Sequence, residues 1–163
     1  MIELYRLIRQ FEGCRLMPYL CPAGKWTCGW GSTGPDVVPG KPWTQEYADM
    51  RMNQDAIKFA RGALVLCPVL TGTAHAAISD FCYNLGVGRL RASTLRKKIN
   101  AGDTAGAVAE LKKWTRGGGR VLPGLVARRA AEAANEARWG MEKASRVRAQ
   151  RLRCTRAPAC RSR

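Results

Sequence analysis

The sequence is poor in acidic residues, has a single histidine and lacks any long apolar run. Its 163 residues include 12 Asp and Glu against 28 Lys and Arg, and the histidine is His75. No segment approaches the roughly 18 uncharged apolar residues that a membrane-spanning helix needs, and the N-terminal MIELYRLIRQFEG carries charges every few residues. We therefore expect neither an anchor nor a signal peptide, and a protein that stays in the cytoplasm until something else opens the membrane.

The sequence also lacks the residue patterns that metal and cofactor sites need. The seven cysteines are an odd number and no secretion signal precedes them, so free thiols are expected. Cys14, Cys21 and Cys28 are separated by six residues each, unlike the close pairs of zinc sites. Residues 117–119 are three glycines that no Gly-Lys-Ser/Thr follows, so they predict a mobile connector rather than a phosphate-binding loop. We expect no metal and no cofactor, and we interpret His75 as an exposed surface residue.

The formal net charge of +16 is shared between the two parts of the chain. Residues 138–163 hold nine Lys and Arg and one acid, and residues 1–137 hold 19 and 11. Such a surface attracts nucleic acid, anionic lipid or an anionic wall polymer without selecting among them, and a charge excess that only aids solubility is the alternative. Because no nucleic-acid reader motif is present, we expect no specific nucleic-acid binding. Residues 140–163 are predicted to be a basic, disordered tail, which either contacts anionic membrane or lipopolysaccharide or is an extension without a function.

Helical and turn patterns alternate along the rest of the chain. Apolar residues three and four apart predict an amphipathic helix over residues 2–12, which Gly13 ends. Turn-forming residues between positions 14 and 40 predict one or two β-hairpins. Further helices are expected at about 44–66, 74–85, 93–101, 103–115 and 125–139. A helix, a small β-lobe and then a run of helices predict an α+β fold, with one domain over residues 1–139.

One short segment, FEGCRLMPYLCPAGKWTCGWGS at residues 11–32, contains a single carboxylate, Glu12. Glu12 falls at the C-terminal end of the first predicted helix, where the helix dipole disfavours the ionised form. Cys21 and Thr27 fall on the two arms of a tight hairpin that folds back beside this helix end. Alone, Glu12 would be an ordinary exposed acid at a helix end; the three residues together suggest a site.

The pattern FEG-RL--Y-CPAG-WT-GWG resembles the signature of the phage-type lysozymes, glycoside hydrolase family 24. In that family a catalytic Glu ends the first helix, an Asp or sometimes a Cys follows nine residues later, and a Thr lies six residues beyond; Glu12, Cys21 and Thr27 match these positions. The resemblance continues through ISDFCYNLGVG, STLRKKINAGD, AVAELKKW and LPGLVARRAAE, and covers roughly residues 2–139. It implies a lysozyme-like fold with an N-terminal helix, a small β-hairpin lobe and a mainly helical C-terminal lobe.

The same resemblance implies an activity and a setting. The protein would be an endolysin with lysozyme activity, a glycosidase that hydrolyses β-1,4 links between N-acetylmuramic acid and N-acetylglucosamine in bacterial peptidoglycan during host cell lysis. We expect a monomer that waits in the host cytoplasm, crosses the membrane through a holin-like pore, and acts on the wall from the periplasm.

Individual residues receive roles from the resemblance. Glu12 would be the general acid, with Arg128 or Arg129 as its supporting cation, and Thr27 would orient the attacking water. Cys21 would stand in for the second acid, although a thiol near its ordinary pKa of about 8.5 is only a few per cent ionised at neutral pH. The expected sugar-groove residues are Tyr83, Asn84 and Thr94.

Two departures from the family pattern leave alternatives open. A cysteine in place of an acid is compatible with a non-catalytic wall-binding protein, with a packing role for Cys21, or with a lytic transglycosylase that cleaves the same bond without water. The sequence GWGS at residues 29–32 stands where many members have GxGH, so a structural histidine contact is expected to be missing. We also expect no hydrophobic, uncleaved leader of the kind that some relatives carry.

Overall fold

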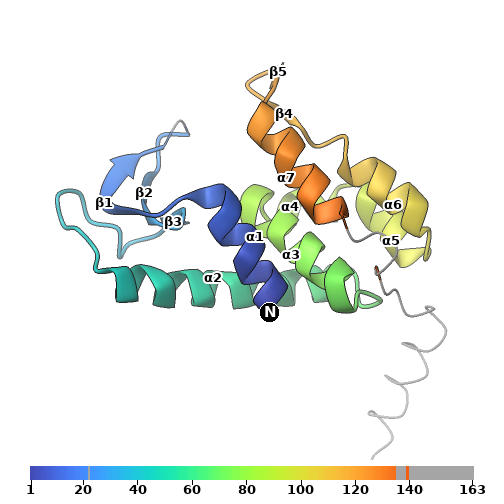
Figure 1. Ribbon diagram of the computed structural model, residues 1–163, viewed down its shortest axis with the longest axis horizontal. Helices are drawn as coiled ribbons and strands as arrows, with labels where there is room; N and C mark the ends of the chain where they lie inside the picture. Colours follow the sequence, from blue (N-terminus) through green and yellow to red (C-terminus); the bar gives the residue numbers. More distant parts are fainter. Residues whose placement is uncertain (22, 135–138, 140–163) are drawn as a thin grey trace, which may run out of the picture.

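The computed structural model describes residues 1–21, 23–134 and 139, and in it a small β-lobe and a helical lobe share one long helix (Figure 1). α1 (Ile2–Glu12) opens the chain and buries Leu4, Leu7 and Ile8. It ends at Gly13, whose φ of 61° is a conformation that glycine adopts without strain. The prediction of a helix over residues 2–12 is confirmed, and Glu12 is its last residue.

The β-lobe is a three-stranded antiparallel sheet in the order β1 (Arg15–Leu20), β2 (Trp26–Gly29) and β3 (Ser32–Thr33). Tyr19 on β1 lies opposite Thr27 on β2, and Thr27 lies opposite Thr33 on β3. The expected hairpins are therefore confirmed. The turn between β1 and β2 follows Cys21, and the turn between β2 and β3 contains Trp30 and Gly31.

α2 (Gln45–Leu66) begins at the predicted cap, where the Thr44 hydroxyl accepts a hydrogen bond from the Tyr47 N–H at 3.2 Å. Its buried face consists mostly of alanines, which let neighbouring helices approach closely; the buried residues are Ala48, Met52, Ala56, Ala60 and Ala63. In Figure 1 this helix runs beneath both lobes.

Polar contacts attach the β-lobe to the first half of α2. Ser32 donates a hydrogen bond to Asp55 at 2.8 Å, and Arg51 bridges Asp55 at 3.0 Å and Asp36 at 2.7 Å. Ser32 occupies the position where the family pattern has a histidine. The histidine is absent, as expected, but a side-chain contact is still made there, because the serine hydroxyl reaches a carboxylate on α2.

The helical lobe packs around α3 (Gly72–Leu85), which is buried along most of its length. α4 (Val87–Arg91), α5 (Thr94–Asn100), α6 (Thr104–Leu111) and α7 (Pro123–Ala133) follow. α4 was not expected, α3 and α7 each begin two residues before their predicted starts, and α6 ends at Leu111 rather than at residue 115. Trp114 still packs its ring edge-on against Phe81, with ring centroids 5.2 Å apart. The predicted continuation of the last helix includes residues 135–138, which lie outside the described residues.

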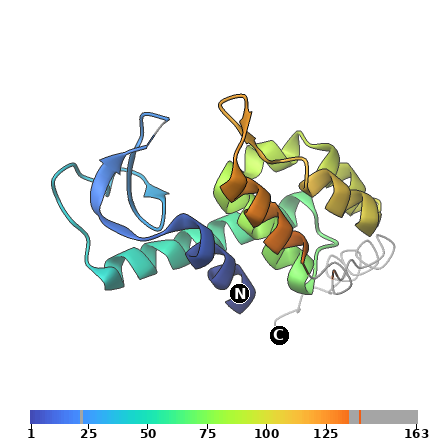
Figure 2. The same ribbon diagram turned by 45° about the horizontal axis from the view of Figure 1, so that its top comes forward.

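The expected connector at residues 117–119 is instead the turn of a short hairpin. β4 (Arg116–Gly117) pairs antiparallel with β5 (Arg120–Val121), and Gly118 and Gly119 make the turn with φ of 56° and 78°. The prediction of a connecting loop missed this strand pairing, because glycines at positive φ suit a tight hairpin turn as well as a loop. Figure 2 shows this hairpin and the β1–β2 hairpin rising on the same side of the molecule.

Three other expectations concern single features. His75 is half-buried rather than exposed, since its Nε2 lies 3.1 Å from the Ala60 carbonyl. All five cysteines in the described part of the chain are free, as expected for them; they are Cys14, Cys21, Cys28, Cys67 and Cys82. None of the described helices combines the length and the apolar character needed to cross a bilayer. The predicted tail, residues 140–163, lies outside the described residues.

Candidate active site

Glu12 is held between a helix of one lobe and a turn of the other. Arg128 NH1 donates to Glu12 Oε1 at 2.6 Å, and the Glu12 side chain is 20% exposed. The second carboxyl oxygen faces Gly31, where a methyl group would lie 3.1 Å from Oε2. Gly31 also has a φ of 87°, so both its conformation and its neighbour favour glycine.

Arg128 is the cation that supports Glu12, and it comes from the middle of α7. Its side chain is 3% exposed, and its Nε and NH2 each donate to Asp80 at 2.8 Å. Burial alone would lower the pKa of Arg128, but the hydrogen bonds and charge of Asp80, with the charge of Glu12, raise it above its ordinary value. Arg128 is therefore a permanent cation that binds two helices besides its own.

Arg129, the alternative partner in the sequence analysis, points elsewhere. Its NH2 lies 2.8 Å from Glu132 Oε1 and donates to Asn84 Oδ1 at 3.1 Å. Burial lowers the pKa of Arg129 and raises that of Glu132 well above its ordinary value, and each charge partly offsets this for the other. Of the two arginines, the structure thus places only Arg128 on Glu12.

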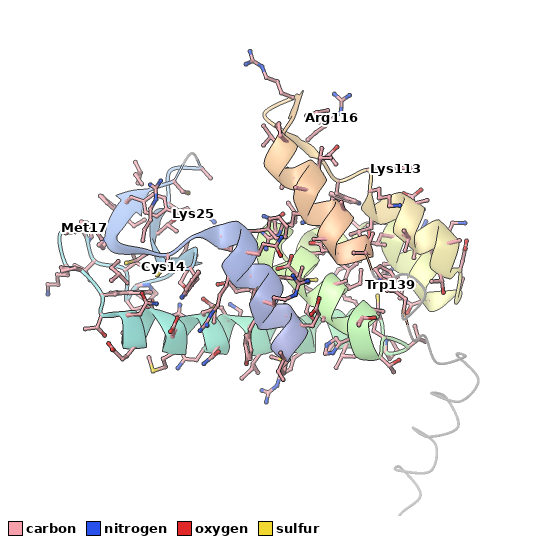
Figure 3. The ribbon with its side chains drawn as sticks, viewed as in Figure 1. Cys14, Met17, Lys25, Lys113, Arg116 and Trp139 are labelled. Carbon is pink, nitrogen blue, oxygen red and sulfur yellow. The ribbon has the colours of Figure 1, made fainter. Side chains whose placement is uncertain are left out.

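Cys21 and Thr27 meet at the turn between β1 and β2. The Cys21 N–H donates to the Lys25 carbonyl at 2.9 Å, and the Thr27 hydroxyl donates to the same carbonyl at 3.1 Å. Hydrogen bonding from the Lys25 backbone lowers the pKa of the Cys21 thiol, and the Thr27 hydroxyl adds to this effect. The expectation of a thiol near its ordinary pKa is wrong, because the direction of the turn amides was not readable from the sequence. Figure 3 shows Lys25 on this lobe.

The three expected sugar-groove residues are not equivalent. The Tyr83 hydroxyl donates to the Trp30 carbonyl at 2.8 Å, which ties α3 to the turn that carries Gly31. Asn84 is half-buried and accepts from Arg129. Thr94 is exposed at the first position of α5. Tyr83 is therefore tied to the turn that lies against Glu12, and Asn84 is tied to Arg129, whereas no contact described in the structure links Thr94 to either of them.

Sequence reasoning missed Gly31, Asp80 and Glu132. Asp80 carried a readable signal, since an acid flanked by Ile78, Phe81 and Cys82 in a buried helix needs a buried cation. Within the residues that the structure describes, no group of three or more His, Cys, Asp and Glu side chains could hold a metal ion. The arrangement is a partly exposed carboxylic acid with a fixed cation, and a thiol with a hydroxyl beside it.

Comparisons with known proteins identify the family of the chain. The family model described as phage lysozyme matches residues 9–132. The chain is 40% identical over 122 residues to the SAR-endolysin of Bacteriophage PS119, a match that covers 74% of this chain and 73% of that protein. It is 39% identical over 135 residues to the endolysin of Acyrthosiphon pisum secondary endosymbiont phage 1, covering 78% and 90%. Among solved structures, the muramidase domain of SpmX from Asticaccaulis excentricus matches with a TM-score of 0.74 and 29% identity, covering 82% and 92%.

The lowered pKa of Cys21 predicts selective alkylation. Because the thiolate is the reacting form, iodoacetamide near neutral pH should label Cys21 well before Cys67 and Cys82, whose pKa values burial raises to about 11 and about 12. The readout is mass spectrometry of tryptic peptides, since residues 16–25 contain Cys21 as their only cysteine. Thr27→Val should slow this labelling, and denatured protein should label throughout. Equal labelling of Cys21 and Cys82 in the folded protein would contradict the prediction.

Proposed function

Because the chain belongs to the phage lysozyme family, we propose that Glu12 is the general acid of its reaction. The protein is an endolysin with lysozyme activity, a glycosidase that cleaves the β-1,4 links of peptidoglycan in host cell lysis. The observation that carries the role of Glu12 is its 2.6 Å contact with Arg128, which fixes a single partly exposed carboxyl group at a helix end.

The contact with Arg128 also selects the oxygen that carries the proton. A guanidinium can only donate hydrogen bonds, so Oε1 must act as an acceptor. In the acid form the proton therefore belongs on Oε2, the oxygen beside Gly31. Oε2 would transfer this proton to the glycosidic oxygen as the bond to the anomeric carbon breaks.

We propose that Cys21 and Thr27 handle the attacking water. The water oxygen bonds to the anomeric carbon while its proton passes to the Cys21 thiolate, and the Thr27 hydroxyl keeps the water in place. The lowered pKa of Cys21 supports this role, because more of the thiol is ionised than at its ordinary pKa. Sugar binding by Tyr83, Asn84 and Thr94 remains a proposal from family resemblance.

We further propose a route to the substrate. Peptidoglycan lies outside the cytoplasmic membrane, so an endolysin made in the host cytoplasm needs passage to the periplasm, and a holin-like pore would provide it. Peptidoglycan is then the one substrate partner, and the protein would act as a monomer. The basic residues 140–163 would assist by contact with anionic lipid or lipopolysaccharide.

Replacing the acid should stop the reaction. Glu12→Gln keeps the volume and can still accept from Arg128, but it has no proton to give at Oε2, so the rate should fall by about 10²- to 10⁴-fold. Expressed in bacteria, the wild type should lyse cells only after chloroform breaches the membrane, and the variant should not lyse them at all. Mass spectrometry of digested peptidoglycan should show reducing muramic ends. Wild-type rates in a folded Glu12→Gln protein would end the proposal.

The place of Glu12 against Gly31 predicts a position-specific effect of a methyl group. Gly31→Ala should lower kcat about tenfold or more, because the new carbon presses on Oε2 and displaces the acid. Gly40→Ala is the matched control, since Gly40 also has a positive φ, 75°, but nothing lies within 4 Å of an added carbon. Both variants should lose about 1 kcal/mol or more of stability. A similar loss of kcat in both would show that strain alone is responsible.

The proposed base role of Cys21 predicts a shift in pH dependence. A carboxylate stays ionised at lower pH than even an acidified thiol, so Cys21→Asp should keep activity and shift the pH optimum to lower pH. Cys21→Ala should lose part of the rate at every pH. The measurement is the initial rate on soluble wall fragments between about pH 4 and 9. Should Cys21→Ala match the wild type throughout, water and Thr27 alone would do this work.

A further inference from the structure

Five ionisable side chains from three helices, Arg128 among them, form one cluster, and four of the five are almost fully buried. Arg128 is 3% exposed, Arg129 1%, and the side chains of Asp80 and Glu132 are 0% exposed. Glu12 is the most accessible member, at 20%. Two arginines thus face three carboxyl groups, so a proton on any one carboxyl depends on the charges of the others.

Asp80 fixes the orientation of Arg128. Its two oxygens accept from Nε and NH2, both at 2.8 Å, along one edge of the planar guanidinium. Because the guanidinium is rigid, occupation of that edge leaves NH1 directed at Glu12. Asp80 comes from α3 and Glu12 from α1, so this one carboxylate sets the geometry of a contact between two other helices.

The groups that face this contact from the neighbouring elements are identifiable. Glu132, on the same helix as Arg128, lies 3.8 Å from its Nε, and burial raises the pKa of Glu132 well above its ordinary value. Tyr19 of β1 and Tyr83 of α3 feel the charge of Glu12, and burial raises the pKa of both, so they are neutral at working pH. Arg129 adds a second positive charge whose partners are Glu132 and Asn84. Asp80 is therefore the anion bound most directly to Arg128.

We propose that Asp80 is a positioning residue for the reaction: it clamps Arg128 and offsets its charge, so that Arg128 orients Glu12 as a rigid hydrogen-bond donor. An arginine with no other partner would favour the carboxylate form of Glu12, which cannot act as an acid. The Arg128–Asp80 pair instead offers Glu12 a rigid donor with little net charge. This inference rests on the proposed role of Glu12 as the general acid.

Asp80→Asn tests the charge while keeping the shape. Arg128 would then be balanced chiefly by Glu12, and the ionised form of Glu12 would gain stability. The comparison is made in the Cys21→Ala background, where no thiol titrates in the site and the alkaline limb reports Glu12 alone. The alkaline limb of the pH profile for kcat on soluble wall fragments should there move by about one unit to lower pH. At the alkaline side kcat should fall about tenfold, with KM nearly unchanged. If the limb of the folded variant coincides with that of the wild type, Asp80 has only a structural role and the inference is overturned.

The double variant Asp80→Asn/Arg128→Gln provides a second test if the single variant fails to fold, because it removes the two opposite charges of the Asp80–Arg128 pair together. If Asp80 offsets Arg128 in the wild type, removal of both should leave the alkaline limb within about half a unit of the wild-type position, and kcat should fall because Glu12 is no longer oriented. If Arg128 acts on Glu12 as an unbalanced charge, the limb should instead move by a unit or more to higher pH. That outcome would also overturn the inference.

Asp36→Asn is the control for the loss of an aspartate–arginine pair elsewhere. Asp36, in the loop after β3, lies 2.7 Å from Arg51 of α2. This variant should therefore lower the melting temperature and leave the alkaline limb in place. These variants distinguish a failure of the proposed role of Glu12 from a failure of the proposed role of Asp80. An active Glu12→Gln variant would remove the proposed function itself, whereas an inactive one together with an unmoved limb in Asp80→Asn would remove only the role of Asp80.

Discussion

The guanidinium of Arg128 is the interaction on which the rest of the site depends. It joins the end of α1, the middle of α3 and α7 through hydrogen bonds of 2.6 to 2.8 Å, and it does so almost without contact with water. Removing Arg128 or Asp80 alone would leave the other as a buried charge without its partner, which is strongly destabilising. The same hydrogen bonds therefore hold the three helices together and orient Glu12, the proposed general acid.

The β-lobe carries Cys21 and Thr27, the residues proposed to handle the attacking water. Ser32, Arg51 and Asp55 attach its last strand to α2, and the Tyr83 hydroxyl holds the Trp30 carbonyl. Both attachments lie next to Gly31, whose missing side chain lets the turn lie against Glu12. The position of this turn thus follows from polar contacts at the edge of the lobe and from Trp30, which packs against the apolar cluster that includes Leu4 of α1 and Met52 of α2.

How much could be predicted from the sequence depended on how local the signal was. The end of α1 at Glu12 was predictable because a helical period and a glycine coincide there. The choice between Arg128 and Arg129 was not, because adjacent residues on a helix differ by about 100° in direction and the phase of α7 depends on its packing. Asp80 was not predicted as a site residue because it lies in a buried helix whose other buried residues are mostly apolar. The lowered pKa of Cys21 depends on turn amides whose directions no residue pattern reveals.

Because α2 is one continuous helix, its length sets the position of the β-lobe relative to the helical lobe. Asp55, in its middle, binds the β-lobe, while Ala60 and Ala63 lie in the packed interior of the helical side. One residue inserted between these positions would rotate the β-lobe attachment by about 100° and displace it by about 1.5 Å along the axis. The hairpin that carries Cys21 and Thr27 would then change its position relative to the helical lobe although every side chain of the site was retained. Substitutions can be absorbed along α2, but a change in its residue count would uncouple the two halves of the enzyme.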